Sequence, residues 1–183
     1  MWKLKSFIAL GLAVVISISG GVSVFASELT IPNRMLTEAE LQAWIDEYVE
    51  LDGISDFELE VIRLINEERA IHRLHPLEFS HELSMAARFK SHKMHDLDYF
   101  SHRSPILQGA PHGYRDTMFG HQNITPGAFG TRENLSLRPN ATPECVVNGW
   151  INSPGHHAAI LLEDALTIGI GRFGSFTTAR FGF

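Results

Sequence analysis

The chain has 183 residues, with 15 Lys+Arg against 21 Asp+Glu and a formal net charge of −6 at pH 7. This acidic balance excludes the basic footprint typical of nucleic-acid-binding proteins, and a hydrophobic share of 44% excludes wholesale disorder. A single cysteine excludes an internal disulfide framework and every zinc or iron–sulfur site built on several cysteines.

Residues 1–26 have the pattern of a secretory signal peptide. Two lysines precede an apolar run over residues 7–18, and Val24 and Ala26 place small residues at positions −3 and −1 of a cleavage site. The alternative is an uncleaved anchor, because residues 7–26 are just long enough to span a bilayer. The interior Ser and Gly residues favour removal, so we expect a secreted, extracellular protein with no stable membrane anchor.

Residues 27–56 are predicted to form an N-terminal lead-in that contains one short helix. The segment 27–36 shows no periodicity, whereas Thr37-Glu38-Ala39-Glu40 is a capping box followed by apolar residues at helical spacing. A second capping box, Ser55-Asp56-Phe57-Glu58, opens the strongest helical pattern in the chain, and His75-Pro76 is predicted to stop it. We assign residues 57–183 to one domain.

The rest of the chain predicts two further helices, a long loop and a hairpin. Ser80 is expected to cap a helix that runs to about residue 96, and residues 99–132 lack any regular pattern. Thr142-Pro143 is expected to open the next helix, which breaks at Ser153-Pro154-Gly155 and restarts as a short turn. Residues 168–173 and 177–183 have the pattern of hairpin strands. Helices first and strands last predict an α+β fold with an antiparallel sheet.

Several blocks, in order and spacing, carry a family resemblance. They are Leu64-Ile65-Asn66-Glu67-Glu68-Arg69, Tyr99-Phe100-Ser101-His102, Glu133-Asn134-Leu135, Asn152-Ser153-Pro154-Gly155-His156-His157, and Ile168-Gly169-Ile170-Gly171. From about residue 57 to 183 the chain resembles a bacterial secreted member of the CAP superfamily. This is the SCP-like domain of cysteine-rich secretory proteins, antigen 5 and pathogenesis-related 1 proteins. The resemblance implies an α-β-α sandwich around a cleft.

The resemblance also implies which residues line that cleft. In the family two histidines and two acidic residues do so; His102, Glu133 and His156 match three of them. The second acid is replaced by Ser153, with Asn152 beside it, so the set is incomplete. Some members bind a divalent metal through the two histidines, others bind sterols or fatty acids, and no reaction is common to the superfamily.

The same three residues can be weighed as chemical groups. Two neutral imidazoles and one carboxylate suffice for zinc with a water in the open position, whereas calcium prefers more oxygen ligands. The alternative is that His102, Glu133 and His156 are hydrogen-bonded residues that hold loops together without a metal.

Three functions follow as expectations. The first is a secreted binding protein rather than an enzyme, whose cleft takes zinc, another divalent metal or a small ligand in the extracellular or cell-wall space. The second is a metal-assisted extracellular hydrolase, protease-like, with Glu133 as the base. The third is a lipid or sterol carrier whose ligand packs against the apolar side chains of residues 99–132. The expected partner is a small ligand, a lipid or a cell-wall component, and no nucleic acid.

Other chemically active side chains are assigned less important roles. The pairs His72/His75 and His92/His95 are expected to be solvated, and His157 is expected to lie at the surface. Cys145 is predicted on an apolar helix face, which would deny a thiol the exposure that catalysis needs. The apolar residues of the same helix, Val146, Val147 and Trp150, are predicted to be core.

Overall fold

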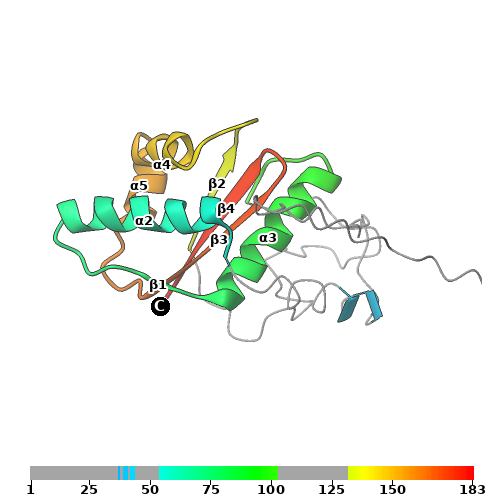
Figure 1. Cartoon of the computed structure of the whole chain (residues 1–183), viewed down its shortest axis with the longest axis horizontal. Coiled ribbons are helices and arrows are strands. Elements are labelled where there is room, and N and C mark those ends of the chain that lie inside the picture. The colour runs from blue at the N-terminus through cyan, green and yellow to red at the C-terminus, as the bar shows by residue number, and fades with distance from the viewer. Residues whose placement is uncertain (1–36, 38, 41, 44–53, 103–131) are drawn as a thin grey trace, which may run out of the picture.

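The computed structural model describes residues 37, 39, 40, 42, 43, 54–102 and 132–183 (Figure 1). Its elements are α2 (Asp56–Ile71), β1 (Glu78–Phe79), α3 (His81–Asp96), β2 (Arg132–Leu137), α4 (Pro143–Ile151), α5 (Pro154–Ile160), β3 (Thr167–Phe173) and β4 (Phe176–Gly182). The predicted signal peptide, most of the lead-in and most of the long loop lie outside the described residues. Within the described ranges, no helix combines the length and apolar character needed to cross a bilayer.

The helix starts lie where the sequence places them. Thr37 and Glu40 form a reciprocal capping box, and Ser55 and Glu58 form another at the start of α2. The hydroxyl of Ser80 accepts from the backbone of α3 in the same way, and a Thr–Pro step opens α4. Four predicted starts are therefore confirmed.

Helix α2 ends before the predicted His75-Pro76 stop. Its last residue is Ile71, and Arg73 takes a left-handed φ of 61°. The amides of Arg73 and Leu74 then return to the carbonyls of Ala70 and Arg69. This local turn ends the helix at Ile71, before the chain reaches Pro76. The proline is therefore not the cause of the helix end.

The four strands form one sheet in the order β1-β3-β4-β2. Strands β3 and β4 are an antiparallel hairpin whose turn uses Gly174 at a φ of +55°. Strand β2 adds antiparallel to β4, while β1 contributes a two-residue parallel edge beside β3. The α+β class is confirmed, but β1 and β2 were not predicted.

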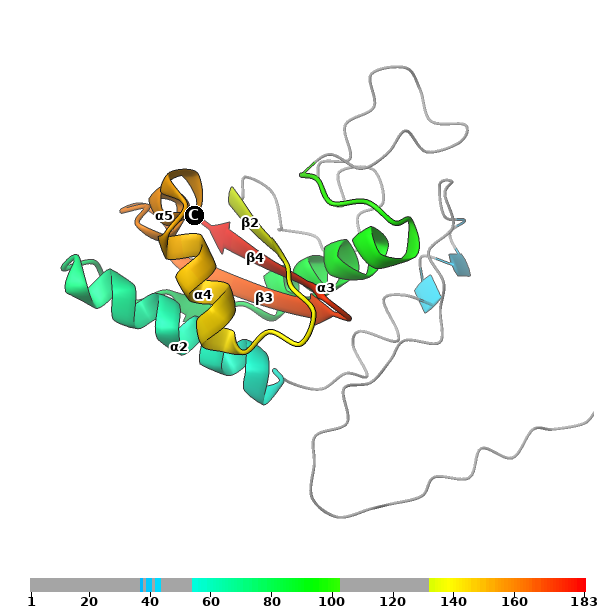
Figure 2. The same cartoon turned by 90° about the horizontal axis from the view of Figure 1, so that it is seen from above.

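Side chains of β3 alternate between two helical layers. Ile168 and Ile170 join the core shared with α2, α4 and α5, whereas Gly169 and Gly171 face α3 on the other side. A Cβ at either glycine would overlap backbone atoms of α3, so glycine is what lets the helix lie directly on the strand. Figure 2 shows α3 on one side of the sheet and α2 with α4 on the other. The α-β-α sandwich is confirmed.

The main core lies between the sheet and α2, α4 and α5. Its fully buried members include Val61, Ile65, Val146, Val147, Trp150, Ile160, Ile168, Ile170 and Phe181. The indole N–H of Trp150 donates to the carbonyl of Leu135 at 2.9 Å, which ties α4 to β2. The predicted core positions on α4 are confirmed.

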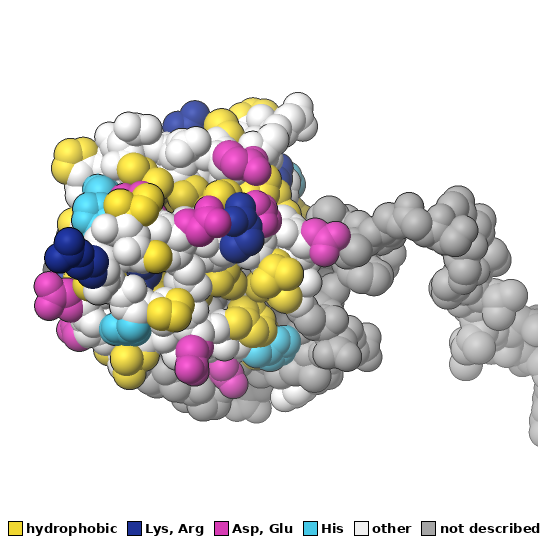
Figure 3. Space-filling model, turned by 60° about the vertical axis from the view of Figure 1, so that its left-hand side comes forward, with side chains coloured by type: hydrophobic (Ala, Val, Ile, Leu, Met, Phe, Trp, Pro, Cys, Tyr) yellow, Lys and Arg dark blue, Asp and Glu magenta, His cyan; other side chains and the backbone are white. Residues whose placement is uncertain are grey.

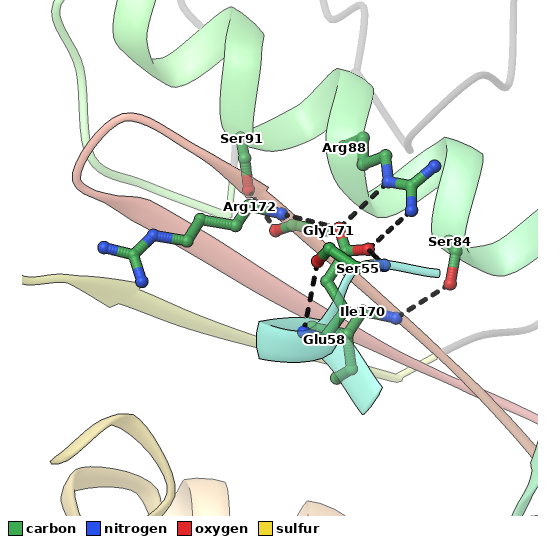
Figure 4. Close-up of polar contacts among 8 residues, drawn as sticks. All are labelled: Ser55, Glu58, Ser84, Arg88, Ser91, Ile170, Gly171 and Arg172. Atoms are coloured by element: carbon green, nitrogen blue, oxygen red, sulfur yellow. Dashed lines mark hydrogen bonds and ion pairs between the residues drawn. The ribbon is translucent and has the colours of Figure 1, made fainter. Parts of the chain in front are cut away.

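Polar side chains complete the edge of β3 that the short β1 leaves open. The amide of Ile170 donates to the Ser84 hydroxyl at 3.1 Å, and the Ser91 hydroxyl donates to the Gly171 carbonyl at 2.8 Å (Figure 4). Glu58 accepts from the amide of Arg172 at 3.2 Å and from Arg88 Nε at 2.9 Å. Because these groups are buried, their pairing joins α2, β3 and α3 into one unit.

Candidate functional site

The C-terminal end of α3 positions the first cleft histidine. Lys90 is buried on α3, and its Nζ donates to the Tyr99 hydroxyl at 3.2 Å and to the His102 carbonyl at 3.4 Å. Between the end of α3 and Tyr99, the chain turns at Asp98, which has a φ of 47°. The backbone of His102 is thus held to the helix while its imidazole remains largely exposed.

Two neighbouring strands supply the groups behind this imidazole. Glu133 of β2 lies opposite Arg180 of β4 in the sheet register, and the two side chains form an ion pair. The Glu133 side chain is 10% exposed and that of Arg180 is 6% exposed. The other oxygen of Glu133 lies 2.8 Å from Nδ1 of His102. A carboxylate only accepts, so in neutral His102 the proton sits on Nδ1 and the lone pair is on Nε2.

Helix α5 supplies the second histidine. The side-chain amide of Asn134, next to Glu133 on β2, donates to the His156 carbonyl at 2.9 Å. Burial lowers the pKa of His156, and positive charge on His102 lowers it further. The ring is therefore biased toward the neutral form that ligates metals.

The structure brings His102 and Glu133 into contact and leaves His156 facing them. The two imidazole centroids are 6.5 Å apart. Two imidazoles on one tetrahedral zinc, with bonds of about 2.0–2.1 Å, have centroids roughly 5 Å apart, so ligation needs a further approach of about 1 Å. Both oxygens of Glu133 are already engaged, by His102 and by Arg180. In this arrangement Glu133 orients His102, and the two imidazoles would have to approach each other before they could share an ion.

The two predicted cleft neighbours do not replace the missing acid. Asn152 ends α4, and its amide donates to the Asn148 carbonyl at 2.7 Å. Ser153 is the N-cap of α5, without a side-chain capping bond. In the described part of the chain, neither side chain is hydrogen-bonded to the three cleft residues.

A second His/Glu grouping lies where the sequence indicated none. Glu68, His72 and His157 bring one ligand atom each to within 4.8 Å of one another, a condition that the three cleft residues do not meet among the described residues. His157 lies at the surface, as expected, with 25% of its side chain exposed, but it is not simply solvated, because its Nε2 lies 2.7 Å from Glu68 Oε1. The i, i+4 spacing of Glu68 and His72 is visible in the sequence. The position of His157 beside them depends on the packing of α5 against α2.

Two side-chain predictions are wrong, those for His92 and Cys145. His92 is 2% exposed and stacks on Phe173 with centroids 3.6 Å apart, so it belongs to the packed interior and not to solvent. Burial lowers the pKa of His92 to about 4, against the opposing effect of the Asp96 carboxylate. Cys145 is exposed, because the apolar face of α4 is carried by Val146 and Trp150.

Comparisons with known proteins agree on the fold. Residues 62–177 match the model of the family described as the cysteine-rich secretory protein family, CAP. The uncharacterised protein YkwD of Bacillus subtilis (strain 168) is 38% identical over 131 residues, which are 70% of this chain and 48% of that protein. The chain thus spans about half the length of this curated relative.

Solved structures give the same result. An extracellular protein containing an SCP domain from Bacillus anthracis is 25% identical with a TM-score of 0.59, covering 80% of this chain and 44% of that one. An outer surface protein from Borrelia burgdorferi is 24% identical with a TM-score of 0.52, covering 74% and 92%. A cysteine-rich secretory protein from Staphylococcus aureus is 17% identical with a TM-score of 0.53, covering 69% and 38%. The last two are similar in fold alone.

Proposed function

This chain belongs to the CAP family of cysteine-rich secretory proteins, and from that premise we propose that it is an exported binding domain. Its cleft would take a divalent metal ion, zinc before calcium, or a small ligand between His102 and His156. The observation that supports this is the chain of contacts from His102 Nδ1 through Glu133 to Arg180. A carboxylate behind a histidine raises its basicity and directs its other nitrogen to the ion.

Export is part of the proposal. Residues 1–26 would direct secretion and be removed, residues 27–56 would lead into the domain, and residues 57–183 would carry the cleft. The Bacillus anthracis and Borrelia burgdorferi neighbours are described as extracellular and outer surface proteins. The site of action would be the extracellular or cell-wall space.

We assign binding rather than turnover because, among the described residues, the carboxylate of the cleft is already paired and is not available as a general base. Glu133 is engaged by Arg180 and His102, and Ser153 occupies the position of the second acid. A metal-assisted hydrolase needs a group that accepts a proton from the metal-bound water. The lipid-carrier alternative depends on the apolar side chains of residues 99–132, of which residues 103–131 lie outside the described ranges. Phe100, which is described, is exposed.

Zinc titration of the purified protein by calorimetry tests this proposal. The variant pair His102→Gln and His156→Gln keeps polar side chains of similar reach but removes both imidazoles. We expect it to lose one equivalent of zinc relative to the wild type, while His95→Gln, at an exposed histidine on α3, loses none. Equal zinc uptake by the cleft pair and the wild type would refute the cleft as a metal site.

A further inference from the structure

One carboxylate oxygen at the surface of the α2–α5 layer meets two imidazoles. Oε1 of Glu68 lies 3.1 Å from Nε2 of His72 and 2.7 Å from Nε2 of His157. The two rings are edge-on, with centroids 5.4 Å apart and planes at 75°. We propose that Glu68, His72 and His157 form a second divalent metal site, of the zinc class, separate from the cleft. We call it the α2–α5 site.

Helix α2 and the buried Arg69 side chain hold these three ligand groups close together. Glu68 and His72 are i, i+4 neighbours at the C-terminal end of α2, so they share one face. The adjacent Arg69 is fully buried, and its guanidinium donates to the carbonyls of Ile160 at 2.7 Å and Leu162 at 2.8 Å. This clamp fixes α5, which carries His157, against α2 (Figure 1). Preorganised ligands lose little freedom when an ion binds.

The donor set suits zinc. Two imidazole nitrogens and one carboxylate oxygen, with water in the fourth position, form a shell that zinc accepts. The centroid separation of 5.4 Å is close to the roughly 5 Å of two imidazoles on one tetrahedral ion. The α2–α5 site thus needs less movement than the cleft, whose rings are 6.5 Å apart.

An ion can reach this position from solvent. The exposed fractions of the side chains are 43% for His72, 25% for His157 and 13% for Glu68. In Figure 3, histidine and acidic side chains reach the surface of the face turned toward the viewer. On binding, the hydrogen bonds from the two Nε2 atoms to Glu68 would be lost, and each imidazole would carry its proton on Nδ1 instead. The two Nε2 atoms and the Glu68 carboxylate would then bind the ion. The net charge of −6 favours cation approach.

A metal here would join two helices that otherwise meet through side chains and the Arg69 clamp. An ion that binds only the folded arrangement stabilises it by mass action. Zinc bound at the α2–α5 site would therefore cross-link α2 and α5 and stabilise the fold, whether or not the cleft binds metal.

The test compares zinc uptake and melting temperature in matched variants of the purified chain. Glu68→Gln and His157→Gln retain polar side chains but weaken or remove the metal ligand. Glu67→Gln is the control, because it removes the same charge from the next residue of α2, where the side chain faces solvent and pairs with Arg63. We expect Glu68→Gln and His157→Gln to lose one equivalent of zinc and the zinc-induced rise in melting temperature, and Glu67→Gln to keep both.

The result is independent of the cleft. Loss of an equivalent in the α2–α5 variants, with the cleft pair retaining it, supports this inference whatever the cleft does. Undiminished zinc uptake and an undiminished melting shift in both Glu68→Gln and His157→Gln overturn it. Circular dichroism without zinc confirms that each variant is folded, and a variant that is not folded is replaced by His72→Gln.

Discussion

Replacing Arg180 by Met should destabilise the protein strongly, because it leaves a charge in the cleft without its partner. Arg180 and Glu133 lie on paired strands and are 6% and 10% exposed. Met fills much of the volume of the arginine stem but cannot pair with a carboxylate. Among the described residues, Glu133 would then keep the N–H of His102 as its hydrogen-bond donor.

The size of the effect follows from the burial of the pair. Removing one partner of a buried ion pair costs about 3–5 kcal/mol, whereas an exposed pair contributes about 0–1 kcal/mol. Because one donor remains on Glu133, we expect about 3 kcal/mol for Arg180→Met, the low end of the buried range. The double variant Glu133→Gln/Arg180→Met also removes the unpaired carboxylate charge, so it should recover part of the lost free energy of unfolding.

Urea unfolding of the wild type, the two single variants and the double variant measures these terms as a double-mutant cycle. The account predicts that the double variant is more stable than Arg180→Met alone. A loss below about 1 kcal/mol for Arg180→Met, or strictly additive single effects, would refute the reasoning that the pair is a buried unit.

Three further predictions test packing, titration and exposure. Gly171→Ala should destabilise by about 3 kcal/mol or more, because its Cβ would overlap the backbone of α3; Gly155→Ala, with nothing within 4 Å, should be nearly neutral in the same unfolding assay. His92 has a pKa lowered from 6.5 to about 4 in the folded state, so the unfolded chain takes up the proton first. Stability should fall by about 3 kcal/mol from pH 6.5 to 4, and His92→Gln should remove that part of the pH dependence. Cys145 is exposed, so a thiol reagent should modify the native protein with one equivalent; protection until denaturant is added would contradict the structure.

The sequence predicts most of the helices and the final hairpin because these depend on local chemistry. Ser55 and Ser80 cap helices through hydrogen bonds to residues three positions later, so their signals are local. The alternation in β3 and the glycine turn after it are local in the same sense.

What the sequence misses depends on contacts between distant segments. Strand β2 contains Glu133 and Asn134, polar residues whose buried positions are made possible by Arg180 and by the backbone of α5. A strand with buried polar side chains lacks the apolar alternation that identifies strands. Strand β1 has two residues, too few for any pattern.

The histidines show the same limit. The polar neighbours of His92 suggested a solvated position, yet Phe173 covers its ring, and the surface residue His157 contacts Glu68 of another helix. Neither contact is visible before β3 and α5 are packed against their helices. The cleft residues were found through family resemblance, since nothing local links His102 to Glu133, 31 positions later.

The most direct test of the central claim, that the cleft binds a divalent ion through its two histidines, is an anomalous diffraction map from crystals of the zinc-loaded protein. The account predicts a zinc peak bonded to Nε2 of His102 and to a ring nitrogen of His156, with Glu133 still hydrogen-bonded to His102 Nδ1. A map with no zinc in the cleft, whether or not the α2–α5 site is occupied, would contradict that claim.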